Sequence, residues 1–329
     1  MDVATAFLNG NLNECIYIEQ PTGYVKDNNK VCKLNKSIYG LKQASRIWNE
    51  RVNEFMKKHE FLQSKCEPCV YYKRSACEYT IVALYVDDFY VFTNCENRKF
   101  YNLLKLEFDV NHLGLLKSCL GMSVTRTDNV IILDQSDYIR KLLMTFGMSQ
   151  CKTVSTPMAL NCKLDSKSEQ SIDDNVYPYR QLMGSLMYLS VCTRPDISFV
   201  CSQLSQHVTN FNKDHWIAAK RVLRYLSGTI NYGLHFYKGD KLNVKAYADA
   251  DWANDPTDRK SYTGFLVKLG NNTVSWEARK QRCVALSSTE AEYLAMSDVC
   301  KELCFIKNFL SELNEMQINM IVYNDNQSA

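Results

Sequence analysis

The sequence predicts an α+β protein of several parts, because segments of strand character and segments of helical periodicity both occur and alternate irregularly along the chain. Hydrophobic residues make up 46% and charged residues 23% of the 329 residues, as in globular chains and unlike disordered or collagen-like ones. A polar stretch at 161–178 and a Gly-containing break at 238–243 mark boundaries. We therefore expect three parts, at 1–125, 126–240 and 241–329.

Within the first part, residues 45–59 place apolar side chains at helical spacing, on one side of a predicted amphipathic helix. The segments 79–86 and 89–93 are rich in β-branched and aromatic residues and are separated by Asp87 and Asp88 alone, which is the length of a two-residue hairpin loop. Tight hairpin turns favour Gly or Asn, so two adjacent carboxylates are unusual there. A solvated acidic turn is the structural alternative to a functional one.

The second and third parts continue the mixture of elements. Residues 215–227 are predicted to form a helix ended by Gly228, with three cations away from its apolar side. Strands are expected at 244–251, 261–269, 273–278 and 318–323. Between the last two we expect a long helix capped by Ser288 or Thr289. Its core stripe consists of Val299, Leu303, Ile306, Leu310 and Leu313.

Acidic residues recur at defined places in the third part. Asp249 and Asp251 are two apart on a predicted strand, so both carboxylates would lie on one face. Glu292 falls on the inward side of the long helix, where a carboxylate is costly without a metal ion or a hydrogen-bond partner. Asp325 ends the last strand.

Net charge and cysteine content exclude several classes. The 39 basic and 36 acidic residues give a net charge of +3, too close to neutral to indicate a nucleic-acid binder without local evidence. No apolar run approaches the length of a membrane span, and the first ten residues have no secretory character. The 14 cysteines are scattered, which favours reduced and mostly buried thiols. Cys66 and Cys69 lack a second pair for zinc and are expected to be packing thiols.

Six motifs occur in a defined order: IYGLKQA, YVDD, TRPD, KRVLRYLSGT, DRKSYTG and SSTEAEY. In this order they resemble the Pol polyprotein of copia-type retrotransposons, in its reverse transcriptase and RNase H region, over essentially the whole chain. The resemblance implies a reverse-transcriptase palm lacking most of the fingers at 1–125, a helical thumb and connection segment at 126–240, and an incomplete RNase H-like fold at 241–329. We expect a region truncated at both ends, without the family's fourth RNase H carboxylate. Asn254 stands where the family commonly has Gly.

For the polymerase site, the resemblance implies that Asp2 and Asp87 bind two metal ions and that Asp88 supports them. Two ions can stabilise the entering and departing oxygens of an in-line attack on phosphorus, and hard cations prefer carboxylate oxygens. Phe7 resembles the aromatic gate that selects deoxynucleotides, with a plain core Phe as the alternative. Gln43 resembles the residue that touches the incoming nucleotide, and Lys42 would add positive charge. An exposed polar pair is the alternative for these two.

For the ribonuclease site, the resemblance implies Asp249, Glu292 and Asp325 as metal ligands, with Asp251 either a further ligand or an exposed turn acid. Contact with nucleic acid is expected from two basic clusters, since binding without sequence preference depends on phosphate neutralisation. A solvated face is the alternative for each. The clusters consist of Lys220, Arg221 and Arg224, and of Arg279, Lys280 and Arg282.

The function expected from the resemblance is RNA-directed DNA polymerase with hybrid ribonuclease, using two Mg²⁺ or Mn²⁺ ions per active site. Its partners would be an RNA template, a DNA primer, the RNA–DNA hybrid, deoxynucleoside triphosphates and other Pol parts, with no membrane. The location would be the cytoplasm, in virus-like particles of an intact element, or the nucleus. An inactive remnant that at most binds nucleic acid is the alternative. Because Asp2 is the second residue, we expect weak or absent polymerisation by this chain.

Overall fold

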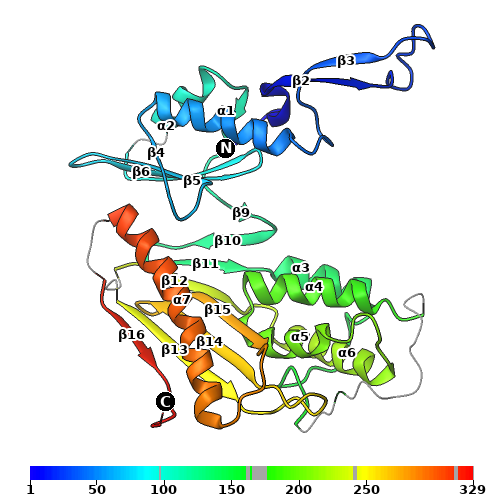
Figure 1. The fold of residues 1–329 in the computed structure, drawn as a ribbon, viewed down its shortest axis with the longest axis vertical. Helices are drawn as coiled ribbons and strands as arrows, with labels where there is room; N and C mark the ends of the chain where they lie inside the picture. The colour runs from blue at the N-terminus through cyan, green and yellow to red at the C-terminus, as the bar shows by residue number, and fades with distance from the viewer. Residues whose placement is uncertain (96–97, 161–163, 165–175, 240–242, 315–317, 329) are drawn as a thin grey trace. The chain divides into compact units, whose positions relative to one another are not determined.

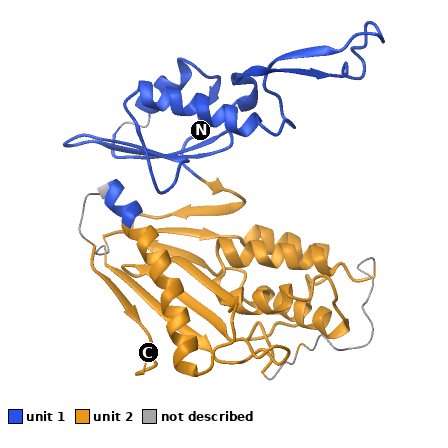
Figure 2. Ribbon diagram, in the orientation of Figure 1, with its two compact units in different colours: residues 1–116, 308–316 blue, residues 117–307, 317–329 orange. Residues whose placement is uncertain are grey.

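The computed structural model describes residues 1–95, 98–160, 164, 176–239, 243–314 and 318–328. Helices and sheets are mixed throughout, as predicted. The contacts divide the chain into two compact units, shown in Figure 2: unit 1 holds residues 1–116 with 308–316, and unit 2 holds 117–307 with 317–329. The functional three-part division stays a prediction. Most of the polar stretch at 161–178 lies outside the described residues.

Unit 1 is built on a sheet of strand order β4-β5-β6-β7-β1-β8, which packs against helices α1 and α2. The predicted first helix is confirmed, and its apolar side is buried in the core of this unit. A separate β2–β3 hairpin extends from the unit (Figure 1). The bounds are β1 Asp2–Val3, η1 Ala6–Asn9, β2 Asn11–Ile18, β3 Cys32–Lys36, α1 Ala44–Lys58, β4 Leu62–Gln63, β5 Val70–Arg74, β6 Tyr79–Tyr85, β7 Asp88–Thr93, α2 Arg98–Lys105 and β8 Val110–Asn111.

The turn of the β6–β7 hairpin is shifted by one residue from the prediction. Tyr85 pairs with Asp88, so the two turn residues are Val86 and Asp87, and Asp88 begins β7. Val86 takes the positive φ, at 55°. The prediction of an Asp87–Asp88 turn was wrong because the strand character of 79–86 hid the turn, whose position is set by contacts from other segments.

In unit 2, helices α3 to α6 share one hydrophobic core and lie together beside the sheets (Figure 1). The first sheet has the order β12-β11-β10-β9 and is antiparallel throughout. Helix α6 begins earlier than predicted, because Asn212 caps it. The bounds are β9 Ser118–Cys119, β10 Met122–Arg126, β11 Val130–Asp134, α3 Ser136–Thr145, α4 Tyr179–Cys192, η2 Pro195–Ile197, α5 Ser198–Ser205, α6 Lys213–Gly228 and β12 Gly233–Tyr237.

The second sheet of unit 2 has the order β15-β14-β13-β16, in which β16 runs parallel to β13. The four predicted strands and the long helix α7 are confirmed. The helix cap differs: the Ser287 hydroxyl, and not Ser288 or Thr289, accepts the backbone N–H of Glu290, whose own carboxylate accepts that of Leu286. The bounds are β13 Val244–Asp251, β14 Tyr262–Leu269, β15 Asn272–Lys280, α7 Ser288–Asn314 and β16 Met320–Tyr323.

No helix among the described residues has the length and hydropathy needed to cross a bilayer. The prediction of mostly buried cysteines was wrong. Of the cysteines that the structure describes, Cys201 alone is buried, and the others are half-buried or exposed. Cys300 and Cys304, for example, occupy the outward side of α7, where the apolar stripe does not require them. Cys66 and Cys69 form no disulfide, and the Cys66 thiol donates a hydrogen bond to Glu312.

Candidate functional site

Three carboxylates meet at one end of the neighbouring strands β13 and β16 of the second sheet. Ligand oxygens of Asp249, Glu292 and Asp325 all lie within 4.8 Å of one another, the one such group of three metal-binding side chains found among the described residues. The topology explains the meeting. Strands β13 and β16 are parallel and end their pairing at Tyr247 and Tyr323. Asp249, still within β13, and Asp325, just beyond β16, each follow two residues later, so both lie at the same end of this parallel pair.

Glu292 completes the group from helix α7. Its side chain is only 6% exposed, whereas Asp249 and Asp325 are exposed. Burial raises the pKa of Glu292, and the charges of Asp249 and Asp325 raise it further. Hydrogen bonds donated by Asn324 and by the backbone N–H of Ala250 oppose this shift. The fold therefore holds the Glu292 carboxylate at a place that disfavours its charge.

The donor set fits a hard divalent cation. Mg²⁺ and Mn²⁺ prefer carboxylate oxygens, and a cation between the three side chains would offset their mutual repulsion. Asp251 stays outside the group of three. Burial and the charge of Asp249 raise its pKa, and it accepts a hydrogen bond from Asn254. This position favours the alternative interpretation of Asp251, an exposed acid, over that of a further metal ligand.

Asn324 is a residue of this site that sequence reasoning missed. Its Nδ2 donates to Glu292 Oε2 at 2.8 Å and to the Ala248 carbonyl at 3.1 Å. Its Oδ1 accepts the backbone N–H of Asn326 at 2.9 Å. The amide therefore joins β13, α7 and the segment after β16. The available signal was its position directly before Asp325, but an amide has no charge that would have drawn attention to it.

The acidic residues of unit 1 meet through the backbone. Strand β1 pairs with β7 so that Asp2 lies opposite Asp88, and the Val3 N–H donates to the Asp87 carbonyl at 3.0 Å. Opposite residues of an antiparallel pair project to one face. Asn111 Nδ2 lies 3.5 Å from Asp2 Oδ2, and the Tyr90 hydroxyl donates to Asp88 Oδ2 at 3.2 Å. These three half-buried aspartates do not form a group as tight as that of unit 2, and their metal binding stays a prediction.

The predicted nucleotide-binding residues lie before and at the start of α1. Phe7, in η1, is half-buried and its ring packs against Tyr39 at 4.5 Å between centroids. Lys42 is exposed, and Gln43 precedes α1 as its N-cap residue. The Gln43 amide donates to Glu14 at 2.9 Å. Phe7 therefore retains both interpretations, gate and packing residue, and the roles of all three stay predictions.

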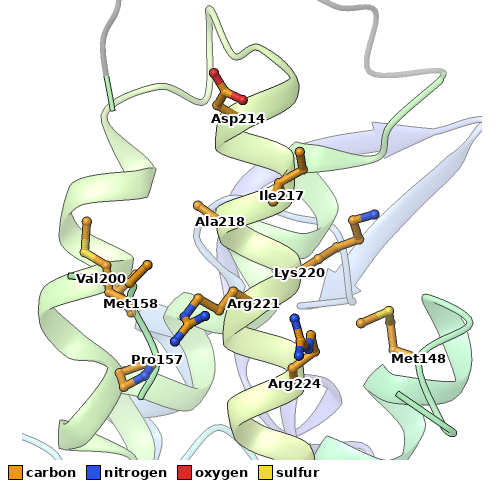
Figure 3. A pocket seen from close by; sticks show the side chains of 11 residues that line it. Met148, Pro157, Met158, Val200, Asp214, Ile217, Ala218, Lys220, Arg221 and Arg224 are labelled. Carbon is orange, nitrogen blue, oxygen red and sulfur yellow. The ribbon is translucent and has the colours of Figure 1, made fainter. Parts of the chain in front are cut away.

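The basic cluster on α6 lines a cavity of about 460 Å³ with apolar walls that include Met148, Met158 and Val200. Figure 3 shows the guanidinium groups of Arg221 and Arg224 within it. Arg221 donates to Thr156 Oγ1 at 2.9 Å, and Arg224 Nε donates to the Lys152 carbonyl at 2.7 Å. The Lys220 ammonium lies 5.6 Å from the Trp216 ring centroid. Both arginines thus bind the segment 152–156, which leads into the residues that line the cavity.

The second basic cluster is also engaged within the protein. Arg279 forms ion pairs with Glu277 and Asp298. Lys280 forms ion pairs with Asp255 at 2.7 Å and Asp258 at 2.9 Å. Arg282 is exposed. Contact of either cluster with nucleic acid stays a prediction.

Comparison with known proteins identifies similar sequences over the whole chain. Residues 1–160 match the family model described as reverse transcriptase (RNA-dependent DNA polymerase). The retrovirus-related Pol polyprotein from transposon TNT 1-94 of Nicotiana tabacum is 43% identical, over 100% of this chain and 26% of its own length. That from transposon RE2 of Arabidopsis thaliana is 38% identical, over 100% and 23%. A putative transposon Ty5-1 protein of Saccharomyces cerevisiae is 32% identical, over 92% of this chain and 100% of its own length. The chain spans about a quarter of the two Pol polyproteins.

Proposed function

Because the chain belongs to the reverse transcriptase family of copia-type transposon Pol polyproteins, we propose that it is the portion that copies RNA into DNA and cuts the RNA of the resulting hybrid. Unit 1 would hold the polymerase site and unit 2 the ribonuclease site. The observation that carries the ribonuclease proposal is the convergence of Asp249, Glu292 and Asp325. The polymerase proposal rests on the family match and on the pairing of β1 with β7.

In the ribonuclease site, a bound divalent ion supplies an activated water and stabilises charge on the phosphate. Asp249 and Asp325 are exposed and would hold the ion on the side from which the hybrid approaches. Glu292 would hold it from the protein side, with its carboxylate oriented by Asn324. A buried, hydrogen-bonded ligand loses little freedom on binding, which favours a fixed ion position.

In the polymerase site, Asp2 and Asp87 would be the metal ligands, with Asp88 in support. Asp2 stands on β1, which is hydrogen-bonded to the segment carrying Asp87 and Asp88, so their backbone atoms are fixed relative to one another. Phe7 would face the sugar of the incoming deoxynucleotide, and Gln43 and Lys42 its phosphates. Gln43 would have to exchange its bond to Glu14 for one to the nucleotide.

The substrates proposed are an RNA template with a DNA primer, deoxynucleoside triphosphates and the RNA–DNA hybrid. The α6 and Arg279–Arg282 clusters would contact phosphates with whichever donors their internal bonds leave available. The thumb and connection segment would span 126–240 and the RNase H region 241–329. Other Pol parts would act with this chain.

Two assays with two variants test the proposal. Cleavage of a labelled RNA–DNA hybrid should require Mg²⁺ or Mn²⁺ and should be abolished by Asp249→Asn but retained by Asp87→Asn. This chain alone should extend a primer on an RNA template weakly or not at all, so extension is measured in a longer Pol polyprotein chain that includes it, where the dependence on the two variants should be the reverse. Asparagine has nearly the same volume as aspartate, so both variants should fold. The activity that each variant retains in the other assay is the internal control for folding. A wild-type chain that binds the hybrid but does not cleave it, together with a longer chain that does not extend the primer, would favour the inactive remnant.

A further inference from the structure

The turn that carries Asp87 has a strained backbone. Val86 has a φ of 55°, in the left-handed region that suits glycine and that a β-branched side chain rarely adopts. The Val86 side chain is 44% exposed, so packing of its own side chain does little to keep it there. Strained residues persist only where surrounding contacts over-determine the conformation. The turn therefore requires bonds to its backbone.

Two such bonds are present, one on each turn residue. Trp48 Nε1 donates to the Val86 carbonyl at 2.5 Å, and the Val3 N–H donates to the Asp87 carbonyl at 3.0 Å. The first comes from α1 and the second from β1. Successive carbonyls of the turn are thus captured by two different elements of unit 1.

The indole is itself held firmly. Trp48 is 2% exposed within the core of unit 1, and its ring packs edge-on against Phe108 at 5.3 Å between centroids. Burial restricts the indole ring to one orientation, so its single N–H has a fixed position and direction. Trp48 lies on the apolar side predicted for the helix at 45–59, but helical spacing gave no indication of the polar contact of its indole N–H.

We infer that Trp48 is a positioning residue: its indole N–H holds the Val86 carbonyl and thereby fixes the direction in which Asp87 leaves the turn. This rests on the proposed role of Asp87 as a metal ligand. Metal ligands act only when held within about 0.5 Å of the productive geometry, and the carboxylate of a strained turn would otherwise sample other directions. Trp48 contributes through the backbone and touches no substrate.

The substitution Trp48→Phe separates this role from packing, since phenylalanine keeps an aromatic ring against Phe108 but has no N–H. The chain supplies a matched control. Trp276 Nε1 donates to the Ser190 carbonyl at 2.7 Å in unit 2, so Trp276→Phe removes a bond of the same kind far from the turn in sequence. Amide hydrogen exchange at residues 86–89, measured with and without Mn²⁺, reports the order of the turn in each protein. Thermal melting checks the fold.

We expect Trp48→Phe to exchange at least about 10-fold faster at 86–89, with the rest of unit 1 unchanged, and to require more Mn²⁺ to regain protection. Trp276→Phe should leave the turn as in the wild type. Unchanged exchange at 86–89, or acceleration spread evenly over unit 1, would overturn the inference. If Mn²⁺ protects the turn in neither the wild type nor any variant, the metal role of Asp87 fails, and the exchange rates without metal still decide the role of Trp48.

Discussion

Replacing Glu292 with Gln tests the ribonuclease site through stability alone. The change removes a charge and keeps the volume of a side chain that is 6% exposed. If Glu292 is a metal ligand, its charge does not stabilise the fold when no ion is bound, so the amide should not destabilise the protein without metal. If Glu292 is a structural acid, the amide should destabilise the protein whether or not metal is present.

The magnitude follows from the geometry. At 4.8 Å, the limit that encloses the three ligand atoms, two unit charges repel by about 1 kcal/mol in a water-like dielectric, which suits the exposed partners Asp249 and Asp325. Neutralising Glu292 therefore relieves about 2 kcal/mol. The amide has one acceptor oxygen, so a bond from Asn324 or Ala250 is lost at a cost of about 1 to 2 kcal/mol. Without metal, the free energy of unfolding should change by no more than about 1 kcal/mol.

Metal changes the comparison. An ion that binds only the folded state stabilises the wild type by about 2.7 kcal/mol at 100 times its dissociation constant. For 329 residues that unfold together, this corresponds to a rise of about 4 °C in melting temperature. Glu292→Gln should show little or none of it.

Differential scanning calorimetry of both proteins, with and without Mn²⁺, measures these quantities. Glu302→Gln is the matched control, because it makes the same change on the same helix about 15 Å further along. It should keep the full metal response. Glu292 is not a metal ligand if Glu292→Gln loses more than about 3 kcal/mol without metal and still gains the wild-type stabilisation from Mn²⁺.

Two further predictions concern unit 2. Burial and the neighbouring His207 lower the pKa of His215 to about 4, so stability that is complete above pH 6.5 is lost as the pH falls toward 4. In the wild type, the free energy of unfolding should be lower at pH 4.5 than at pH 7.5, and this decrease should be about 2.5 kcal/mol larger than in His215→Asn. The asparagine keeps an acceptor for the Asn212 N–H. Equal decreases in the two proteins would contradict this prediction. Arg194 is 1% exposed and donates to Asp196 and Thr229, so Arg194→Met should cost about 3 kcal/mol in urea unfolding. Arg46→Met, which breaks the exposed pair with Glu50, should leave the midpoint unchanged, and equal effects of the two would show that burial is unimportant.

Periodicity predicted the elements well where one face of a segment is buried. Of the stripe predicted for α7, Val299, Leu303 and Ile306 are buried, whereas Leu310 and Leu313 are half-buried. The apolar side of α1 followed directly from spacing, because burial imposes that spacing. The place of the β6–β7 turn did not. Val86 is not a typical turn residue, and the bonds that hold Val86 and Asp87 come from Trp48 and Val3, 38 and 84 positions away in the chain.

The candidate site was predictable as far as charge carries a signal. Asp249, Glu292 and Asp325 were named from the sequence, and the structure brings them together. Asn324 was missed because its role depends on which groups surround its amide. The basic clusters show the opposite case. The sequence gives no partners for the cations of Arg221 and Arg279. In the structure, their side chains donate to Thr156 and Asp298, which belong to other segments.

Two separate groups of carboxylates, one in each unit, are proposed to bind divalent metal. Paramagnetic broadening of backbone amide signals by trace Mn²⁺ tests this binding directly, since the ion broadens only nearby amides. The wild type should show two broadened groups, one around residues 2, 87 and 88 and one around 249, 292 and 325. Asp87→Asn should abolish the first alone and Glu292→Gln the second alone. Broadening that is absent from both groups, or that both variants leave unchanged, would contradict metal binding at these carboxylates.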